Sequence, residues 1–172
     1  MSRKMSNQFV PFSPRQKTIL SWWTDGSQFR DYNGIIADGS IRSGKSTAMA
    51  MGFIFWAMER FNDRNFAICG VTIGALWRNI LNDTCKTLER HGYKLLNRKG
   101  SSMLVVTKGD HSNRFYQFSG YDERSQDAIQ GITLAGVYFD EVALMPESFV
   151  NQATGRCSVD GSKFWFNCNP EF

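Results

Sequence analysis

Two glycines, a lysine and a serine stand at the spacing G-x-x-x-x-G-K-S within the stretch DGSIRSGKSTAMAMG, residues 38–52. A short β-branched run precedes the spacing at residues 34–38, and a helical pattern without proline follows over residues 44–61. Glycines let the backbone wrap so that successive N–H groups converge, and the amino end of the helix adds positive potential. The spacing therefore predicts a strand, a phosphate-binding loop and a helix.

Each residue of this loop has an expected part in holding the phosphates of a nucleotide. Lys45 is expected to reach the β- and γ-phosphates, and the Ser46 hydroxyl to hold Mg²⁺. Arg42 can approach a transferring phosphoryl group and assist catalysis, or it can stay in solvent. The other expected contacts are Gly39, Ser40, Ile41, Ser43, Gly44 and Thr47, the last as a hydroxyl of the first helical turn.

An acidic pair follows a second apolar run, in GVYFDEVALMP. Asp140 is expected to hold Mg²⁺, directly or through water. Glu141 lies one residue further along, where it is expected to orient and deprotonate a water molecule at the γ-phosphate. Two acids that only end a strand are the plain alternative, but together with the loop they indicate nucleotide hydrolysis.

Strand and helix patterns alternate along the chain. Further strands are expected at residues 66–71, 134–139 and 163–168, helices at 73–90 and 147–157, and a short polar helix or ordered loop at 122–130. Residues 102–108 and 113–119 flank the turn GDHS and predict a β-hairpin at a sheet edge. The alternation predicts an α/β fold with a mostly parallel central sheet flanked by helices.

Length and composition limit the class of protein. The chain has 172 residues, 42% of them apolar, which is enough for one ordinary buried core. Its 20 Lys and Arg against 16 Asp and Glu permit an anionic partner without requiring one. The most apolar window, residues 48–58, is too short to cross a bilayer. The cysteines lack C-x-x-C spacing and are expected as reduced core thiols of a cytosolic protein: Cys69, Cys85, Cys157 and Cys168.

With the loop and the acid pair in place, the chain resembles the ATPase domain of large terminase subunits, the DNA-packaging motors of tailed bacteriophages, and most closely their PBSX-like branch. The resemblance rests on DGSIRSGKST, on FYQFSGYDERSQDAIQGITLAGVYFDEVALMP and on the terminal FNCNP. It implies a P-loop NTPase of the ASCE type that hydrolyses ATP with Mg²⁺ to drive double-stranded DNA into a procapsid. Residues 1–172 would then be one ATPase domain, with an adenine-side segment at 1–30 and the P-loop core at 34–172.

The resemblance also assigns roles to residues outside the loop. Asn169 and Pro170 match the motif that couples hydrolysis to movement, although Cys168 replaces the hydroxyl residue usual there. In FVPFSPRQKTILSWW, Arg15 and Gln16 match the adenine-binding segment, and a Gln amide can pair with both a donor and an acceptor on adenine. A surface turn that leads into an amphipathic helix explains the same residues equally well.

The resemblance implies a set of partners as well. They are double-stranded DNA, a portal protein, a small terminase subunit and further copies of the chain in a ring, in the cytoplasm of an infected or lysogenic bacterium. No membrane partner is expected. No nuclease activity is expected either, because the C-terminal nuclease domain is expected to be absent. A helicase-like DNA translocase and a nucleotide-binding interaction module without turnover stay open as alternatives. One basic group can face either DNA or solvent: Lys86, Arg90, Lys94, Arg98 and Lys99.

Overall fold

A single mixed β-sheet organises the computed structural model, which describes residues 12–39 and 44–169. The strand order across the sheet is β1-β7-β6-β2-β5-β4-β3. The strands are β1 (Gly34–Asp38), β2 (Asn65–Gly70), β3 (Lys94–Arg98), β4 (Met103–Lys108), β5 (His111–Ser119), β6 (Gly136–Phe139) and β7 (Lys163–Cys168). The expected loop contacts Ser40, Ile41, Arg42 and Ser43, and the expected coupling residue Pro170, lie outside the described residues.

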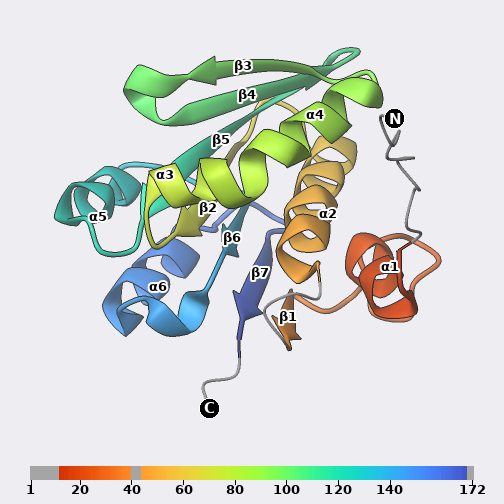
Figure 1. Cartoon of the computed structure of the whole chain (residues 1–172), viewed down its shortest axis with the longest axis horizontal. Helices are drawn as coiled ribbons and strands as arrows, with labels where there is room; N and C mark the ends of the chain where they lie inside the picture. The colour runs from red at the N-terminus through yellow and green to blue at the C-terminus, as the bar shows by residue number, and fades with distance from the viewer. Residues whose placement is uncertain (1–11, 40–43, 170–172) are drawn as a thin grey trace, which may run out of the picture.

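The pairing of the strands confirms the mostly parallel sheet with an antiparallel hairpin at one edge. The five strands β1, β7, β6, β2 and β5 run parallel to one another. The strands β4 and β3 continue the sheet in antiparallel pairs and form its far edge, at the top of Figure 1. The carboxyl ends of the five parallel strands therefore all lie at one end of the sheet.

Helices cover both faces of the sheet. They are α1 (Pro14–Ser21), α2 (Lys45–Arg60), α3 (Ile73–Leu76), α4 (Asn82–Arg90), α5 (Glu123–Gln130) and α6 (Glu147–Gly155). Alternate strand residues enter two separate apolar clusters, because successive side chains on a strand point to opposite faces. Phe66 and Ile68 join the cluster beneath α2 and α4, whereas Ala67 and Cys69 join the cluster that contains Phe149 of α6. Burial on both faces is what a parallel sheet requires.

Aromatic side chains fill the larger cluster. Phe53 of α2 is fully buried, and its ring lies 5.8 Å from that of Trp165 and 5.9 Å from that of Phe66 between centroids. Trp22 packs edge-on against Trp165 at 5.0 Å, which attaches α1 to the sheet. The core residues thus tie the segment before β1 and the helix after it to the same central strands.

Two elements differ from the sequence expectation. The expected helix over residues 73–90 is interrupted by a π-helical turn at Trp77–Leu81, between α3 and α4. The expected two-stranded hairpin has a third strand, β3, which pairs with β4. The strand β3 was missed because four of its five residues are exposed, so only Leu95 contributes an apolar contact. Within the described residues, no helix combines the length and the apolar character needed to cross a membrane.

Candidate functional site

The strands β1, β7 and β6 are adjacent and parallel, so their carboxyl ends lie side by side. Asp38 pairs in register with Cys168, and Phe139 pairs with Phe166, which places Gly39, Asp140 and Asn169 at one end of the sheet. The helix α2 begins at the same end, directly after Gly44, whose φ of 70° lies in the left-handed region that favours glycine. The topology therefore joins the two predicted motifs, 94 residues apart in sequence from Ser46 to Asp140.

Lys45 is held by backbone and side-chain oxygens at the ends of two strands. The residue is 8% exposed, and Nζ donates to the carbonyl oxygens of Gly39 and Cys168, the latter at 2.8 Å. A third bond joins Nζ to the side-chain oxygen of Asn169 at 2.7 Å. The ammonium group thus sits between the phosphate-binding loop and the predicted coupling residue.

Ser46 and Asp140 meet beside Lys45. The Ser46 hydroxyl donates to Asp140 Oδ1 at 3.2 Å. Asn167 Nδ2 donates to both of them, at 2.8 Å to Ser46 Oγ and 2.7 Å to Asp140 Oδ1. The Tyr138 hydroxyl donates a further bond to Asp140 Oδ1 at 3.1 Å. Donors from α2, β6 and β7 therefore converge on one carboxylate oxygen.

Asn167 and Tyr138 are site residues that sequence reasoning did not assign. Asn167 is 2% exposed, and its own Oδ1 has no hydrogen-bond partner among the residues that the structure describes. Tyr138 is fully buried, and burial together with the adjacent Asp140 raises the pKa of its hydroxyl well above the usual value. The hydroxyl therefore stays protonated and donates to the carboxylate. Side chains two positions apart on a strand point to the same face, so Tyr138 shares a face with Asp140, and Asn167 shares a face with Asn169. This alternation was the sequence signal that could have identified both residues.

The oxygens of Ser46 and Asp140 suit a small divalent cation. Mg²⁺ prefers oxygen ligands in octahedral geometry at about 2.0–2.1 Å, so neighbouring ligands on one ion are about 3 Å apart. The measured separation of 3.2 Å between Ser46 Oγ and Asp140 Oδ1 is close to that value. Within the described part of the chain, no group of three or more His, Cys, Asp or Glu side chains gathers to hold a metal. Two protein oxygens are enough for Mg²⁺, because this ion usually takes its other ligands from water and from the phosphates of a substrate.

Glu141 follows the strand end in a strained backbone conformation. Its φ of 56° is in the left-handed region, which is uncommon for residues other than glycine. Backbone strain of this kind is concentrated at functional sites. Partial burial, and then the charge of Asp140, raise the pKa of the Glu141 carboxyl above its usual value. A carboxylate with a raised pKa is a stronger base than an ordinary surface glutamate.

The amino-terminal helix brings Gln16 against the phosphate-binding loop. A Cβ atom added to Gly44 would lie 2.5 Å from Gln16 Nε2, so the end of the Gln16 side chain approaches the Gly44 backbone closely and would have to shift for a larger residue. Ser13 and Gln16 form a capping box at the start of α1, in which Gln16 Oε1 accepts from the Ser13 amide at 2.8 Å. Arg15 and Thr47 are exposed on the first turns of α1 and α2.

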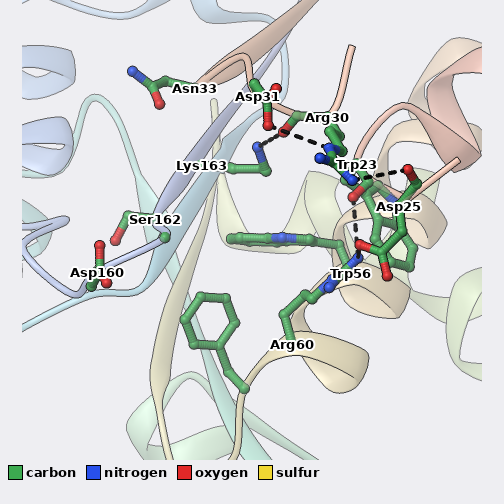
Figure 2. Close-up of a pocket in the computed structure, with 12 residues that line it drawn as sticks. Trp23, Asp25, Arg30, Asp31, Asn33, Trp56, Arg60, Asp160, Ser162 and Lys163 are labelled. Atoms are coloured by element: carbon green, nitrogen blue, oxygen red, sulfur yellow. Dashed lines mark hydrogen bonds and ion pairs between the residues drawn. The ribbon is translucent and has the colours of Figure 1, made fainter. Parts of the chain in front are cut away.

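A separate cavity of about 400 Å³ lies at the other end of the same strands (Figure 2). It is lined by Lys163 at the start of β7 and by Asn33 just before β1. Its cations have partners within the fold, since Arg60 pairs with Asp25 at 2.8 Å and Lys163 donates to the backbone oxygen of Arg30 at 2.8 Å. These contacts join the loop before β1 to α2 and β7, and we assign the cavity a structural role.

Comparisons with known proteins bear on the family and the fold of the chain. A family model described as "Terminase large subunit, T4likevirus-type, N-terminal" matches residues 36–160. The large terminase of a thermophilic bacteriophage is 54% identical over 94% of the chain, with a TM-score of 0.91. The chain spans 40% of the length of that protein. A structure of the same terminase with ATP-gamma-S also matches, at 51% identity and a TM-score of 0.86, over 93% of this chain and 38% of that one.

A more distant structure supports the fold alone. The ATPase domain of the Thermus phage P74-26 large terminase is 17% identical, with a TM-score of 0.63, and the match covers 95% of this chain and 71% of that one. No sequence among the curated proteins matches the chain. On the family model and the match to the thermophilic phage terminase together, the chain belongs to the large terminase subunit family and corresponds to its N-terminal domain.

Proposed function

We propose that the chain binds and hydrolyses ATP with Mg²⁺ as the ATPase domain of a motor that moves double-stranded DNA into a viral procapsid. One observation carries the proposal: Lys45, Ser46 and Asp140 converge at the carboxyl ends of the parallel strands. Structures of the thermophilic phage terminase in complex with ADP and with ATP-gamma-S support nucleotide binding by this chain.

In this proposal the phosphates lie in the loop that connects β1 to α2. Lys45 turns from the oxygens of Cys168 and Asn169 to the β- and γ-phosphates. The backbone of residues 39–44 and the amino end of α2 supply further donors, and Arg42 neutralises charge on the transferring group. Gln16 and Arg15 contact the adenine, which the approach of Gln16 to Gly44 supports.

Ser46 and Asp140 are the residues that would hold Mg²⁺. The ion neutralises charge on the phosphates when it is bound. Asn167 and Tyr138 hold the Asp140 carboxylate in one orientation, since each donates a hydrogen bond to Oδ1. Because that oxygen is already oriented, binding of Mg²⁺ requires less reorganisation of the site.

Glu141 is proposed as the base that orients a water molecule and takes its proton. The raised pKa of Glu141 and its place one residue beyond Asp140 support this role. Asn169 is proposed as the residue that senses the γ-phosphate, because its side-chain oxygen accepts a hydrogen bond from Lys45 of the phosphate-binding loop. Pro170 follows it and completes the coupling motif.

The proposal extends to the assembled machine. Residues 1–172 act as one ATPase domain of the PBSX-like branch, with residues 1–30 on the adenine side and residues 34–172 as the core. The partners are a portal protein, a small terminase subunit and further copies of the chain in a ring, in the cytoplasm of the bacterial host. DNA cleavage is not proposed for these residues.

The test is a calorimetric titration of Mg·ATP into the purified chain, followed by phosphate release in the same samples. Lys45→Ala should lose binding, because it removes the cation that the phosphates need. Glu141→Gln should keep binding and lose turnover, because the amide cannot accept the proton of water. Equal turnover in the parent and in Glu141→Gln would contradict the assignment of the base.

A matched control separates these effects from unfolding. Glu147→Gln removes a carboxylate from the exposed first turn of α6 and should leave both binding and turnover unchanged. Binding without hydrolysis by the parent would favour the interaction module without turnover. Absence of binding by the parent would overturn the proposal for the loop itself.

A further inference from the structure

The positive charge of the chain is concentrated in one segment at the hairpin edge. Residues 78–108 hold seven Lys or Arg and two acids, a net charge of +5. The whole chain has 20 Lys or Arg and 16 Asp or Glu, so the remaining residues hold 13 and 14, a net charge of −1. The segment runs from the π-helical turn through α4, β3 and β4, which lie together at the top of Figure 1.

The cations of this segment are exposed, and most of their side chains are unpaired. Five side chains make no hydrogen bond or ion pair with any residue that the structure describes, namely Arg78, Arg90, Lys94, Arg98 and Lys99. Elsewhere among the described residues the cations are mixed, since Arg60 pairs with Asp25 at 2.8 Å and Arg114 pairs with Asp63 at 2.7 Å, whereas the side chains of Lys17, Arg64 and Arg156 are exposed and unpaired. Unpaired cations of one sign produce the positive potential that attracts a polyanion.

A cavity of about 390 Å³ borders this segment, between the π-helical turn and the strands β3 to β5. It is lined by Ile73, Trp77, Asn82, Asn97, Lys99, Ser102 and Gln117, with no carboxylate among them. Gln117 is 2% exposed, and its Oε1 has no hydrogen-bond partner among the described residues. Lys, Asn, Gln and Ser side chains are the groups that contact phosphate and sugar oxygens of nucleic acids.

The edge strand β3 adds backbone donors to these side chains. Within the described residues β3 pairs on one side only, with β4, so the N–H groups along its other side are available. Lys94 and Arg98 are four residues apart on one face of this strand, about 13 Å along it. A DNA strand carries a phosphate about every 3.4 Å of helix axis, so the strand β3 spans several phosphates.

We propose that this surface, residues 78–108, binds the sugar-phosphate backbone of double-stranded DNA. The inference rests on the proposed packaging function for the identity of the polyanion, and it assigns a surface to the DNA grip. Cations on an edge strand also protect it from pairing with other strands. That role does not account for Arg78 and Arg90, which lie on the helical segments.

The test is a fluorescence-anisotropy titration of the 172-residue chain against a labelled DNA duplex of about 30 base pairs, from about 50 to 200 mM KCl, without nucleotide or Mg²⁺. Lys94→Gln/Arg98→Gln/Lys99→Gln should weaken binding at least about tenfold at about 100 mM KCl. Each lost phosphate contact removes about 0.9 from the slope of log K against log salt, so the slope should fall by about 2 to 3.

A matched variant controls for net charge. Lys17→Gln/Arg64→Gln/Arg156→Gln removes the same charge from exposed residues outside the surface, and both its affinity and its slope should stay near those of the parent. Asn82→Ala/Asn97→Ala should weaken binding without a change of slope, because the lost contacts carry no charge. Thermal melting of each variant should confirm the fold.

Equal losses in the two triple variants would overturn the proposal, because net charge alone would then explain binding. Absence of DNA binding by the parent at the lowest salt concentration would overturn it as well. Because no nucleotide is present, the result is independent of the ATPase proposal. A chain that binds DNA through residues 78–108 but fails to bind ATP would support the surface and contradict the nucleotide site.

Discussion

Lys45 Nζ lies 2.7 Å from the side-chain oxygen of Asn169, so the lysine of the phosphate-binding loop donates a hydrogen bond to the predicted coupling residue. If Lys45 binds the β- and γ-phosphates as proposed, the phosphates and Asn169 compete for the same ammonium group. Binding of the γ-phosphate would release the end of β7, and loss of phosphate would restore the contact. In the proposed function, this competition would couple hydrolysis to the residues that follow β7.

The first prediction concerns this competition. Asn169→Ala should bind Mg·ATP about fivefold more tightly than the parent, since the variant lacks a bond of about 1 kcal/mol that competes with the phosphates for Lys45. Its turnover should fall, because the γ-phosphate loses its partner. Calorimetry and phosphate release measure the two effects. Asn33→Ala, at the other end of the strands, should change neither, and weaker ATP binding by Asn169→Ala would contradict the competition.

The second prediction concerns the residues that orient Asp140. Asn167→Ala removes the bonds to Ser46 and Asp140, and loss of such an orienting partner typically lowers metal affinity or activity about 10–100-fold. Turnover should be recovered in part by raising the Mg²⁺ concentration, while affinity for ATP measured without Mg²⁺ should stay unchanged. A purely structural role would lower both together.

Tyr138→Phe should show the same shift in Mg²⁺ dependence to a smaller degree, because only one hydrogen bond to Asp140 is lost. Tyr116→Phe on β5 is its matched control, since the Tyr116 hydroxyl has no hydrogen bond within the part of the chain that is described. The Mg²⁺ concentration for half-maximal turnover separates the two variants. Equal values would assign the Tyr138 hydroxyl no part in orienting the carboxylate.

The sequence was sufficient to predict the part of the site that depends on local motifs. The spacing from Gly39 to Ser46 requires a strand before it and a helix after it, and Asp140 ends an apolar strand. Parallel strands with helical connections leave few arrangements, so the meeting of Ser46 with Asp140 followed from topology.

The orienting residues depend on strand register, which the sequence does not display. Asn167 reaches Asp140 because β7 pairs with β6 so that Phe166 lies opposite Phe139. A shift by one residue would turn Asn167 to the other face of the sheet. The strand β3 was not predicted for a related reason. Only Leu95 packs into the core, so the strand lacks the alternation of apolar and polar residues that would have marked it.

A third prediction tests the packing beneath α2. In Gly136→Ala the new Cβ would lie 2.6 Å from the ring of Trp56, which is 1% exposed and is packed against Phe66 and Trp165. Overpacking of this kind costs about 1–3 kcal/mol in the free energy of unfolding, which urea titration measures. Gly155→Ala, with no atom within 4 Å of its new Cβ, should be neutral or stabilising by up to about 1 kcal/mol. Equal stability of the two variants would contradict tight packing at Trp56.

The last prediction concerns the four cysteines, which form no disulfide. Burial raises the pKa of the Cys157 thiol to about 12 and that of Cys85 to about 11, while burial and then the Asp38 carboxylate raise the pKa of Cys168. Burial raises the pKa of Cys69 well above the usual value. Since the thiolate is the reactive form, labelling of the folded chain by iodoacetamide at about pH 8 should be slow and should quicken as pH rises.

Cys168 should be labelled first, because the pKa values of Cys85 and Cys157 leave on the order of one thiol in a thousand or fewer ionised at about pH 8. Mass spectrometry of peptides locates the label, and in guanidinium all four thiols should react at similar rates. Bound Mg·ATP should slow labelling at Cys168, because the charge of Lys45 lowers the pKa of this thiol and would move away when the lysine turns from the Cys168 carbonyl to the phosphates. An unchanged rate at Cys168 in saturating Mg·ATP would mean that Lys45 keeps its contact with β7, and the competition between phosphate and Asn169 would then be wrong.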